Sequence, residues 1–107
     1  MSDFFLKQYD RLPVLRANLS TDDGYVDLSN TSVQFVYQRK NRLTPPTTGN
    51  ASILGSASGY VEYAWPTGST SSKGVYYGEW RVATSSGKQM TFPNDSYFVF
   101  ELAEGLY

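Results

Sequence analysis

The sequence predicts an all-β protein, an antiparallel β-sandwich of about seven or eight strands. Three observations predict it. Apolar and polar residues alternate with a period of two along most of the chain. Turn-forming residues separate the alternating runs at intervals of roughly ten residues, as in sandwiches with Greek-key-like connections. Aromatic residues, which favour strands, make up 16% of the chain, and no window shows the spacing of an amphipathic helix.

The length of 107 residues favours a single domain over residues 1–107. A chain of this size buries roughly two-thirds of its unfolded surface, which is enough for one modest core. A closed β-barrel is the alternative architecture, because it would satisfy the same alternation.

The alternation is clearest in five segments, where every second residue is apolar and would face the core. The segments are 15–20, 33–38, 60–65, 76–82 and 98–102. Trp65 and Trp80 fall in the apolar phase of their segments. We therefore expect both indole rings to fill the space between the two sheets.

Turn residues separate these strands. Asp22-Asp23-Gly24 predicts a hairpin turn, and Ser86-Gly87 predicts another before the strand at 88–92. Pro93-Asn94-Asp95 would end that strand before Tyr97.

Two longer loops are also expected. The loop at 41–50 contains Pro45 and Pro46, which cannot join a central strand. The loop at 66–74 is mostly Ser, Thr and Gly, so we expect it to be mobile.

Composition excludes several classes of function. Without histidine or cysteine, the chain has no catalytic triad, no cysteine nucleophile, no disulfide and no cysteine-ligated metal. The net charge of −1 favours no nucleic-acid partner, and the cluster Arg39, Lys40 and Arg42 reads as a solvated strand end. No targeting segment or membrane-spanning run is expected, and neither is a cofactor.

Five groups of residues follow one another along nearly the whole chain. They are, in order, Phe4-x-Leu6-Lys7-Gln8 with Leu12-Pro13-Val14-Leu15-x-Ala17-x-Leu19, Asp23-Gly24-x-Val26-Asp27-Leu28 with Val33-x-Phe35, Gly59-x-Val61-x-Tyr63-x-Trp65, Gly74-x-Tyr76-x-Gly78-Glu79-Trp80, and Thr91-Phe92-Pro93-Asn94 with Tyr97. Their order and spacing resemble the immunoglobulin-like module of tailed-phage and prophage baseplate upper proteins and related small phage tail components.

The resemblance implies an immunoglobulin-like β-sandwich that acts as a non-enzymatic structural part of a virion tail or baseplate. The implied partners are other phage tail or baseplate proteins. A homo-oligomer is compatible with the rings and trimers from which tails are built. The implied location is the virion, after synthesis in the cytoplasm of the bacterial host.

Candidate contact residues follow from the alternation. Tyr60 and Tyr77 lie opposite the expected core faces of their strands, and Val75 and the Pro45-Pro46 loop are further candidates for partner binding. Exposed tyrosines can anchor a protein partner or stack on sugar rings, so a carbohydrate-binding β-sandwich in an adhesin or receptor-binding part is the alternative function. They can also simply cover the second face of a sheet.

An enzyme or a metal site would need other residues. Glu62 and Glu79 are the best carboxylate pair for a glycosidase-like centre, although both also fit solvent-facing strand positions, with Arg81 as a charge partner of Glu79. Turn carboxylates could ligate calcium, but their spacing is ordinary turn chemistry. These carboxylates are Asp22, Asp23, Asp27 and Asp95. We expect no catalytic site and no metal site.

Two glycines flank Tyr76 within one predicted strand. Gly74 and Gly78 could belong to a phosphate-binding loop, but no helix start follows them. They more simply predict a bulge or a close approach of backbone to another group.

Overall fold

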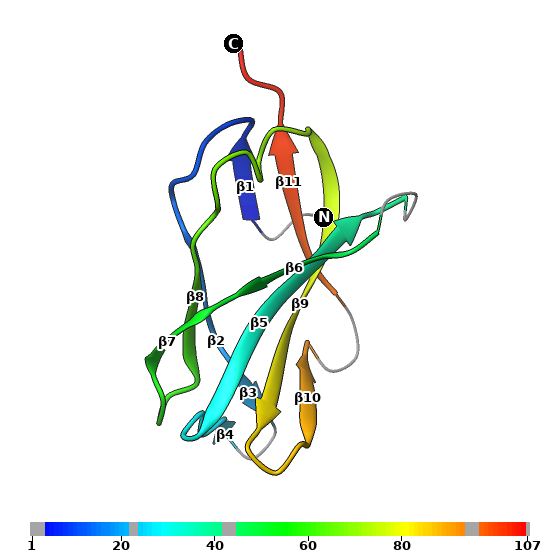
Figure 1. The fold of residues 1–107 in the computed structure, drawn as a ribbon. Coiled ribbons are helices and arrows are strands. Elements are labelled where there is room, and N and C mark those ends of the chain that lie inside the picture. Colours follow the sequence, from blue (N-terminus) through cyan, green and yellow to red (C-terminus); the bar gives the residue numbers. More distant parts are fainter. Residues whose placement is uncertain (1–3, 22–23, 42–44, 94–96, 107) are drawn as a thin grey trace.

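A computed structural model describes residues 4–21, 24–41, 45–93 and 97–106, and these residues form strands and loops without a helix. Two sheets pack face to face around the core, and a short two-stranded ribbon lies at one end (Figure 1). The predicted all-β class is therefore confirmed.

The larger sheet has six strands. Along the sheet they are β1 (Phe4–Lys7), β11 (Phe98–Ala103), β9 (Gly74–Thr84), β5 (Thr31–Arg39) and β6 (Thr47–Asn50), with β10 (Gln89–Phe92) also paired to β9. Only the β1–β11 pairing is parallel among the described strands. β11 pairs with the first half of β9 and β10 with the second half, so both lie along the same edge of β9.

The smaller sheet has three antiparallel strands. They are β2 (Leu15–Asn18), β8 (Tyr60–Tyr63) and β7 (Ser52–Gly55). β3 (Ser20–Thr21) and β4 (Gly24–Tyr25) form the separate ribbon, whose pairing matches the predicted hairpin, although Asp22 and Asp23 lie outside the described residues.

The core lies between the two sheets and is built from the apolar phase of the alternation. Trp65 and Trp80 keep only 1% and 3% of their surface exposed, which confirms the expectation for both. Phe35 contacts both sheets, with its ring centroid 4.8 Å from Trp80 and 5.1 Å from Tyr63. Aromatic packing at these separations contributes stability beyond area burial.

The described residues form eleven strands, where the sequence predicts seven or eight. Part of the difference lies in the expected loop at 41–50. The loop ends at Pro46, and β6 begins at the next residue as an edge strand. An edge position agrees with the adjacent prolines, because an outer strand needs pairing on one side only.

The two glycines of β9 mark close approaches, as expected. A Cβ atom added at Gly78 would lie 2.6 Å from the Phe35 ring, and one added at Gly74 would lie 2.7 Å from the Arg39 guanidinium. Gly78 thus lets the fully buried ring of Phe35 rest against the backbone of β9.

The loop at 66–74, which the composition predicts to be mobile, is hydrogen-bonded to neighbouring segments in the structure. Its carbonyl groups accept hydrogen bonds from Tyr9 N–H at Thr70 (3.0 Å) and from the Tyr76 hydroxyl at Ser72 (2.6 Å). Thr70 is 1% exposed. These bonds attach the loop to β9 and to the segment after β1.

Candidate functional site

The outer face of the six-stranded sheet carries the candidate site. On β9 the alternation directs Tyr76, Gly78 and Trp80 to the core, so Tyr77 and Glu79 point outward. The register places Gln38 of β5 and Val99 of β11 on either side of Tyr77. A row of outward side chains therefore crosses the middle of the sheet.

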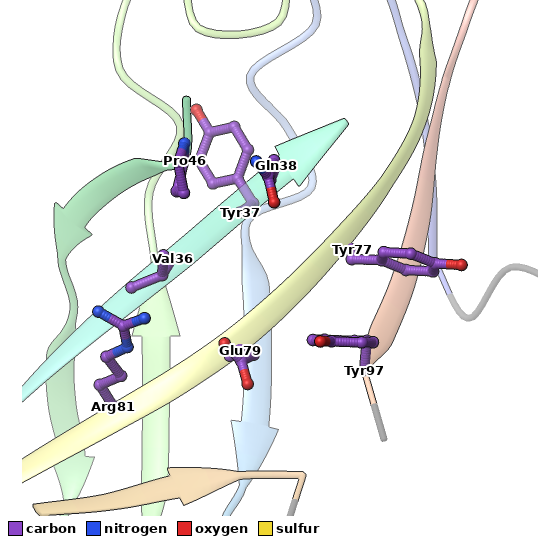
Figure 2. A pocket seen from close by; sticks show the side chains of 8 residues that line it. All are labelled: Val36, Tyr37, Gln38, Pro46, Tyr77, Glu79, Arg81 and Tyr97. Carbon is purple, nitrogen blue, oxygen red and sulfur yellow. The ribbon is translucent and has the colours of Figure 1, made fainter. Parts of the chain in front are cut away.

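A groove of about 150 Å³ runs along this face (Figure 2). Its lining residues come from β5, β9, the segment before β6 and the residue before β11. They are Val36, Tyr37, Gln38, Pro46, Tyr77, Glu79, Arg81 and Tyr97.

Tyr77 and Tyr97 form a stacked pair at one side of the groove. Their ring centroids are 4.8 Å apart and their planes differ by 20°. Figure 2 shows the two rings one above the other, with Tyr77 on β9 and Tyr97 just before β11. The pair therefore forms one aromatic surface with two hydroxyl groups.

Val36 gives the groove an apolar floor. It lies in the outward phase of β5, opposite Glu79 of β9 and Thr48 of β6, yet it is only 5% exposed. Figure 2 shows Arg81 extending toward it along the sheet. The outer face is thus partly apolar where a solvated sheet face would carry polar side chains.

The groove carries both signs of charge. In the described part of the chain, Glu79 and Arg81 form no ion pair with each other, so the predicted charge pairing is wrong. The two side chains therefore present a carboxylate and a guanidinium that a bound partner can pair.

The sequence-predicted contact residues lie in three places. Tyr77 and Pro46 line the groove, and Val75 follows the same outward phase of β9. Pro45 lies beside a second groove near β6, which Pro46 also reaches. Tyr60 is on β8, whose Val61 and Tyr63 are buried, so it points outward from the three-stranded sheet on the opposite side of the molecule.

The second groove is wider, about 730 Å³, and lies between β6 and residues 66–72. Tyr37, Tyr63 and Tyr76 contribute to its lining from the core side. Burial raises the pKa of all three phenols above the ordinary value, and Arg39, beside Tyr76, opposes the shift at Tyr76. These hydroxyl groups therefore stay protonated and able to donate hydrogen bonds at neutral pH.

Glu62 and Glu79 do not form a joint site. Glu62 is on the outer face of the three-stranded sheet and Glu79 is on the outer face of the six-stranded sheet, so the core separates them. Glu62 instead accepts a hydrogen bond from Arg16 Nε at 2.8 Å. This arrangement is incompatible with a paired-carboxylate mechanism.

The calcium hypothesis concerns four aspartates, of which Asp22, Asp23 and Asp95 lie outside the described residues. Asp27 accepts hydrogen bonds from the Ser29 N–H (2.9 Å) and hydroxyl (2.7 Å), and these lower the pKa of its carboxyl group. Its carboxylate thus serves the turn before β5. Across the described ranges, no three acidic side chains gather in a group that could hold a metal ion.

Sequence reasoning missed four residues of the groove, Val36, Tyr37, Gln38 and Tyr97. Val36 is apolar in the polar phase of its strand, and this departure from alternation was a usable signal. Tyr97 precedes β11, and only the pairing of β11 with β9 brings it onto Tyr77. The residues around Tyr97 carry no sequence signal for the pairing of β11 with β9.

Comparisons with protein-family models, curated proteins and solved structures found no match to this chain. Within the residues that the structure describes, no helix is long and apolar enough to cross a membrane.

Proposed function

We propose that the chain is a non-enzymatic structural module of a phage or prophage tail or baseplate, held in place by protein–protein contacts through the outer face of its six-stranded sheet. The observation that carries the proposal is the composition of that face. Its outward positions combine the Tyr77–Tyr97 stack with aliphatic groups such as Val36 and Val75. Aromatic anchors within a mixed apolar and polar rim are typical of protein interfaces.

A second apolar group extends this face toward β1. Phe5 is 61% exposed and pairs in register with Glu101, which in turn pairs with Val75. The outward row therefore reads Phe5, Glu101 and Val75, next to the row that contains Tyr77. Exposed apolar groups on one sheet face, here on either side of Glu101, favour burial by a partner.

The strand order supports an immunoglobulin-like assignment within this proposal. The run β11-β9-β5-β6 corresponds to the order G-F-C-C′ of variable-type domains, and β2-β8-β7 corresponds to B-E-D. The resemblance to phage baseplate modules provides the second support. Most of its large apolar and aromatic motif residues, including Leu15, Phe35 and Trp65, are core residues, so this part of the resemblance concerns the framework more than the contact surface.

Purified phage tails or baseplates provide the test of this proposal. Quantitative mass spectrometry should find the chain at a fixed stoichiometry in tails or baseplates purified by gradient sedimentation from a producing culture. The matched sample is the unsedimented fraction of the same lysate. Recovery of the chain only in that fraction would rule out the structural role.

Carbohydrate binding is the second candidate, and the stacked tyrosines beside Glu79 and Gln38 are the observation that favours it. Aromatic rings with nearby polar groups can hold a sugar. Isothermal titration with polysaccharide from the host cell wall separates the two functions. Saturable binding that Tyr77→Ala abolishes without unfolding the protein would favour the sugar.

A further inference from the structure

β6 has an edge with outward-pointing backbone groups. β5 is its sheet neighbour, and β6 is the last strand of the six-stranded sheet. Ala51 N–H donates to the Val33 carbonyl at 2.9 Å, and Lys40 N–H donates to the Val75 carbonyl at 2.8 Å. The backbone N–H and C=O groups of odd-numbered β5 residues therefore form hydrogen bonds with β6, and those of even-numbered residues form hydrogen bonds with β9. Because bonding alternates along antiparallel strands, the N–H and C=O groups of Thr48 and Asn50 point away from β5.

This edge lacks the features that usually prevent pairing with another strand. Its sequence, Thr47-Thr48-Gly49-Asn50, contains no charged residue and no proline, and three of the four residues are exposed. Protected edges usually carry a lysine, a proline or a bulge. The Pro45-Pro46 pair lies before the strand and leaves the outward groups of Thr48 and Asn50 accessible.

The wide groove of about 730 Å³ lies directly beside this edge. One wall is β6, and the other is formed by residues 66–72, which follow β8 in the chain (Figure 1). A Cβ atom added at Gly49 would lie 2.6 Å from Tyr63 Cε1, so the tyrosine ring reaches the backbone of β6 and forms the floor there. The groove therefore offers backbone groups on one side and hydroxyl groups on the other.

Arg39 gives the groove its charge. Among the described lining residues it alone is charged. Its guanidinium lies 5.5 Å from the centroid of the Tyr76 ring and donates from Nη2 to the Lys73 carbonyl at 2.8 Å. These contacts hold the cation in place, and the described lining contains no carboxylate to compensate it. An occupant with an acidic side chain would complement it.

We infer that the edge of β6 binds an extended acidic segment of a partner protein, which adds to the six-stranded sheet as a further strand. Backbone hydrogen bonds to Thr48 and Asn50 would supply affinity, and Arg39 would select the acidic side chain. The inference rests on the proposed function and deepens it, because it specifies how a neighbouring protein is attached.

The test uses a defined probe. The probe is a set of nonapeptides with acetylated and amidated ends, in which Thr and Val alternate. Each peptide carries one Glu, placed at a different central position. A control set carries Lys at the same positions. Wild-type protein should bind Glu peptides more tightly than Lys peptides in fluorescence polarisation. Binding should also slow hydrogen exchange at the amides of Thr48 and Asn50.

Two variants of Thr48 isolate the backbone contribution. Thr48→Pro removes an N–H that the sheet does not use, a change that edge strands tolerate. It should weaken peptide binding by about tenfold or more, because hydrogen bonds to the added strand are lost. Thr48→Val keeps the N–H and the side-chain shape, so it should bind like wild type. Fluorescence of the buried Trp65 and Trp80 verifies that both variants are folded.

Arg39→Gln should remove the preference for Glu over Lys peptides. Absence of peptide binding at millimolar concentration, or equal binding by Thr48→Pro and Thr48→Val, would overturn the inference. Either result would leave the proposed function intact if the chain is still found in purified particles. Absence from particles would reject the proposed function whatever the peptides do.

Discussion

Phe35 shows how one residue couples the two sheets. It belongs to β5 of the larger sheet, and its ring lies 5.1 Å from Tyr63 of the smaller sheet, centroid to centroid. It is fully buried, and Gly78 on the neighbouring strand leaves room for it. The glycine and the phenylalanine are therefore a complementary pair.

Gly78→Ala should destabilise the protein by about 1–3 kcal/mol, the usual cost of overpacking a core. The added methyl group would lie 2.6 Å from Phe35 Cζ, and a fully buried ring cannot move aside. Chemical denaturation measures the loss. In a Phe35→Leu background the same substitution should cost less, and equal costs in both backgrounds would show that the two residues are not coupled.

Tyr37 makes stability sensitive to alkaline pH. Burial raises its pKa above the ordinary tyrosine value of about 10, so its contribution is complete below pH 10 and is lost as pH rises through the folded-state pKa. Tyr37→Phe should therefore decrease the loss of unfolding free energy above pH 10. Denaturant titrations across that range measure the slope, and an unchanged slope would show that Tyr37 does not contribute to it.

At the scale of an element, the turn between β9 and β10 also depends on a glycine. Gly87 adopts a φ of 88°, its N–H donates to Thr84 O at 3.0 Å, and Thr84 N–H donates to Lys88 O at 2.9 Å. The hairpin requires a left-handed residue at this point, which glycine provides without strain.

Gly87→Ala should cost about 1 kcal/mol, because alanine is strained at positive φ although open space surrounds the position. Gly87→Asn is the matched control, since asparagine tolerates this conformation better. Thermal unfolding should place the asparagine variant between wild type and Gly87→Ala. The reverse order would mean that side-chain contacts, and not φ, decide the effect.

Strands with clear alternation were predictable, and strands without it were not. The predicted segments 33–38 and 76–82 lie within β5 and β9, because each has one strongly apolar face. β6 has no large apolar residue, so its pairing with β5 could not be inferred from its own side chains. The parallel pairing of β1 with β11 joins the two ends of the chain, and local pattern carries no information about it.

The candidate site was predictable only in part for the same reason. Alternation placed Tyr77 outward correctly, but it could not assign Tyr60 and Tyr77 to different sheets. Sheet assignment depends on which strands pair across long sequence distances. Tyr97 lines the groove only because β11 pairs with β9.

At the scale of the whole molecule, the two outer faces differ in chemistry. The three-stranded sheet presents the ion pair between Arg16 and Glu62, whose N–O distance is 2.8 Å. The six-stranded sheet presents the tyrosine stack, Val36 and the nearby Phe5. Under the proposed function, the partner contacts the larger sheet, and the smaller sheet stays in solvent although it also exposes Leu54.

Incorporation of tyrosine variants into particles tests this assignment most directly. The fraction of the chain that sediments with purified tails is measured for Tyr77→Ala, Tyr97→Ala and Tyr60→Ala, each first shown to be folded. Loss of an interface anchor of about 1.4 kcal/mol or more corresponds to at least about tenfold weaker association. Tyr77→Ala and Tyr97→Ala should therefore reduce incorporation strongly, whereas Tyr60→Ala, on the opposite face, should match wild type. Normal incorporation of the first two variants, or loss of incorporation with Tyr60→Ala alone, would contradict the account.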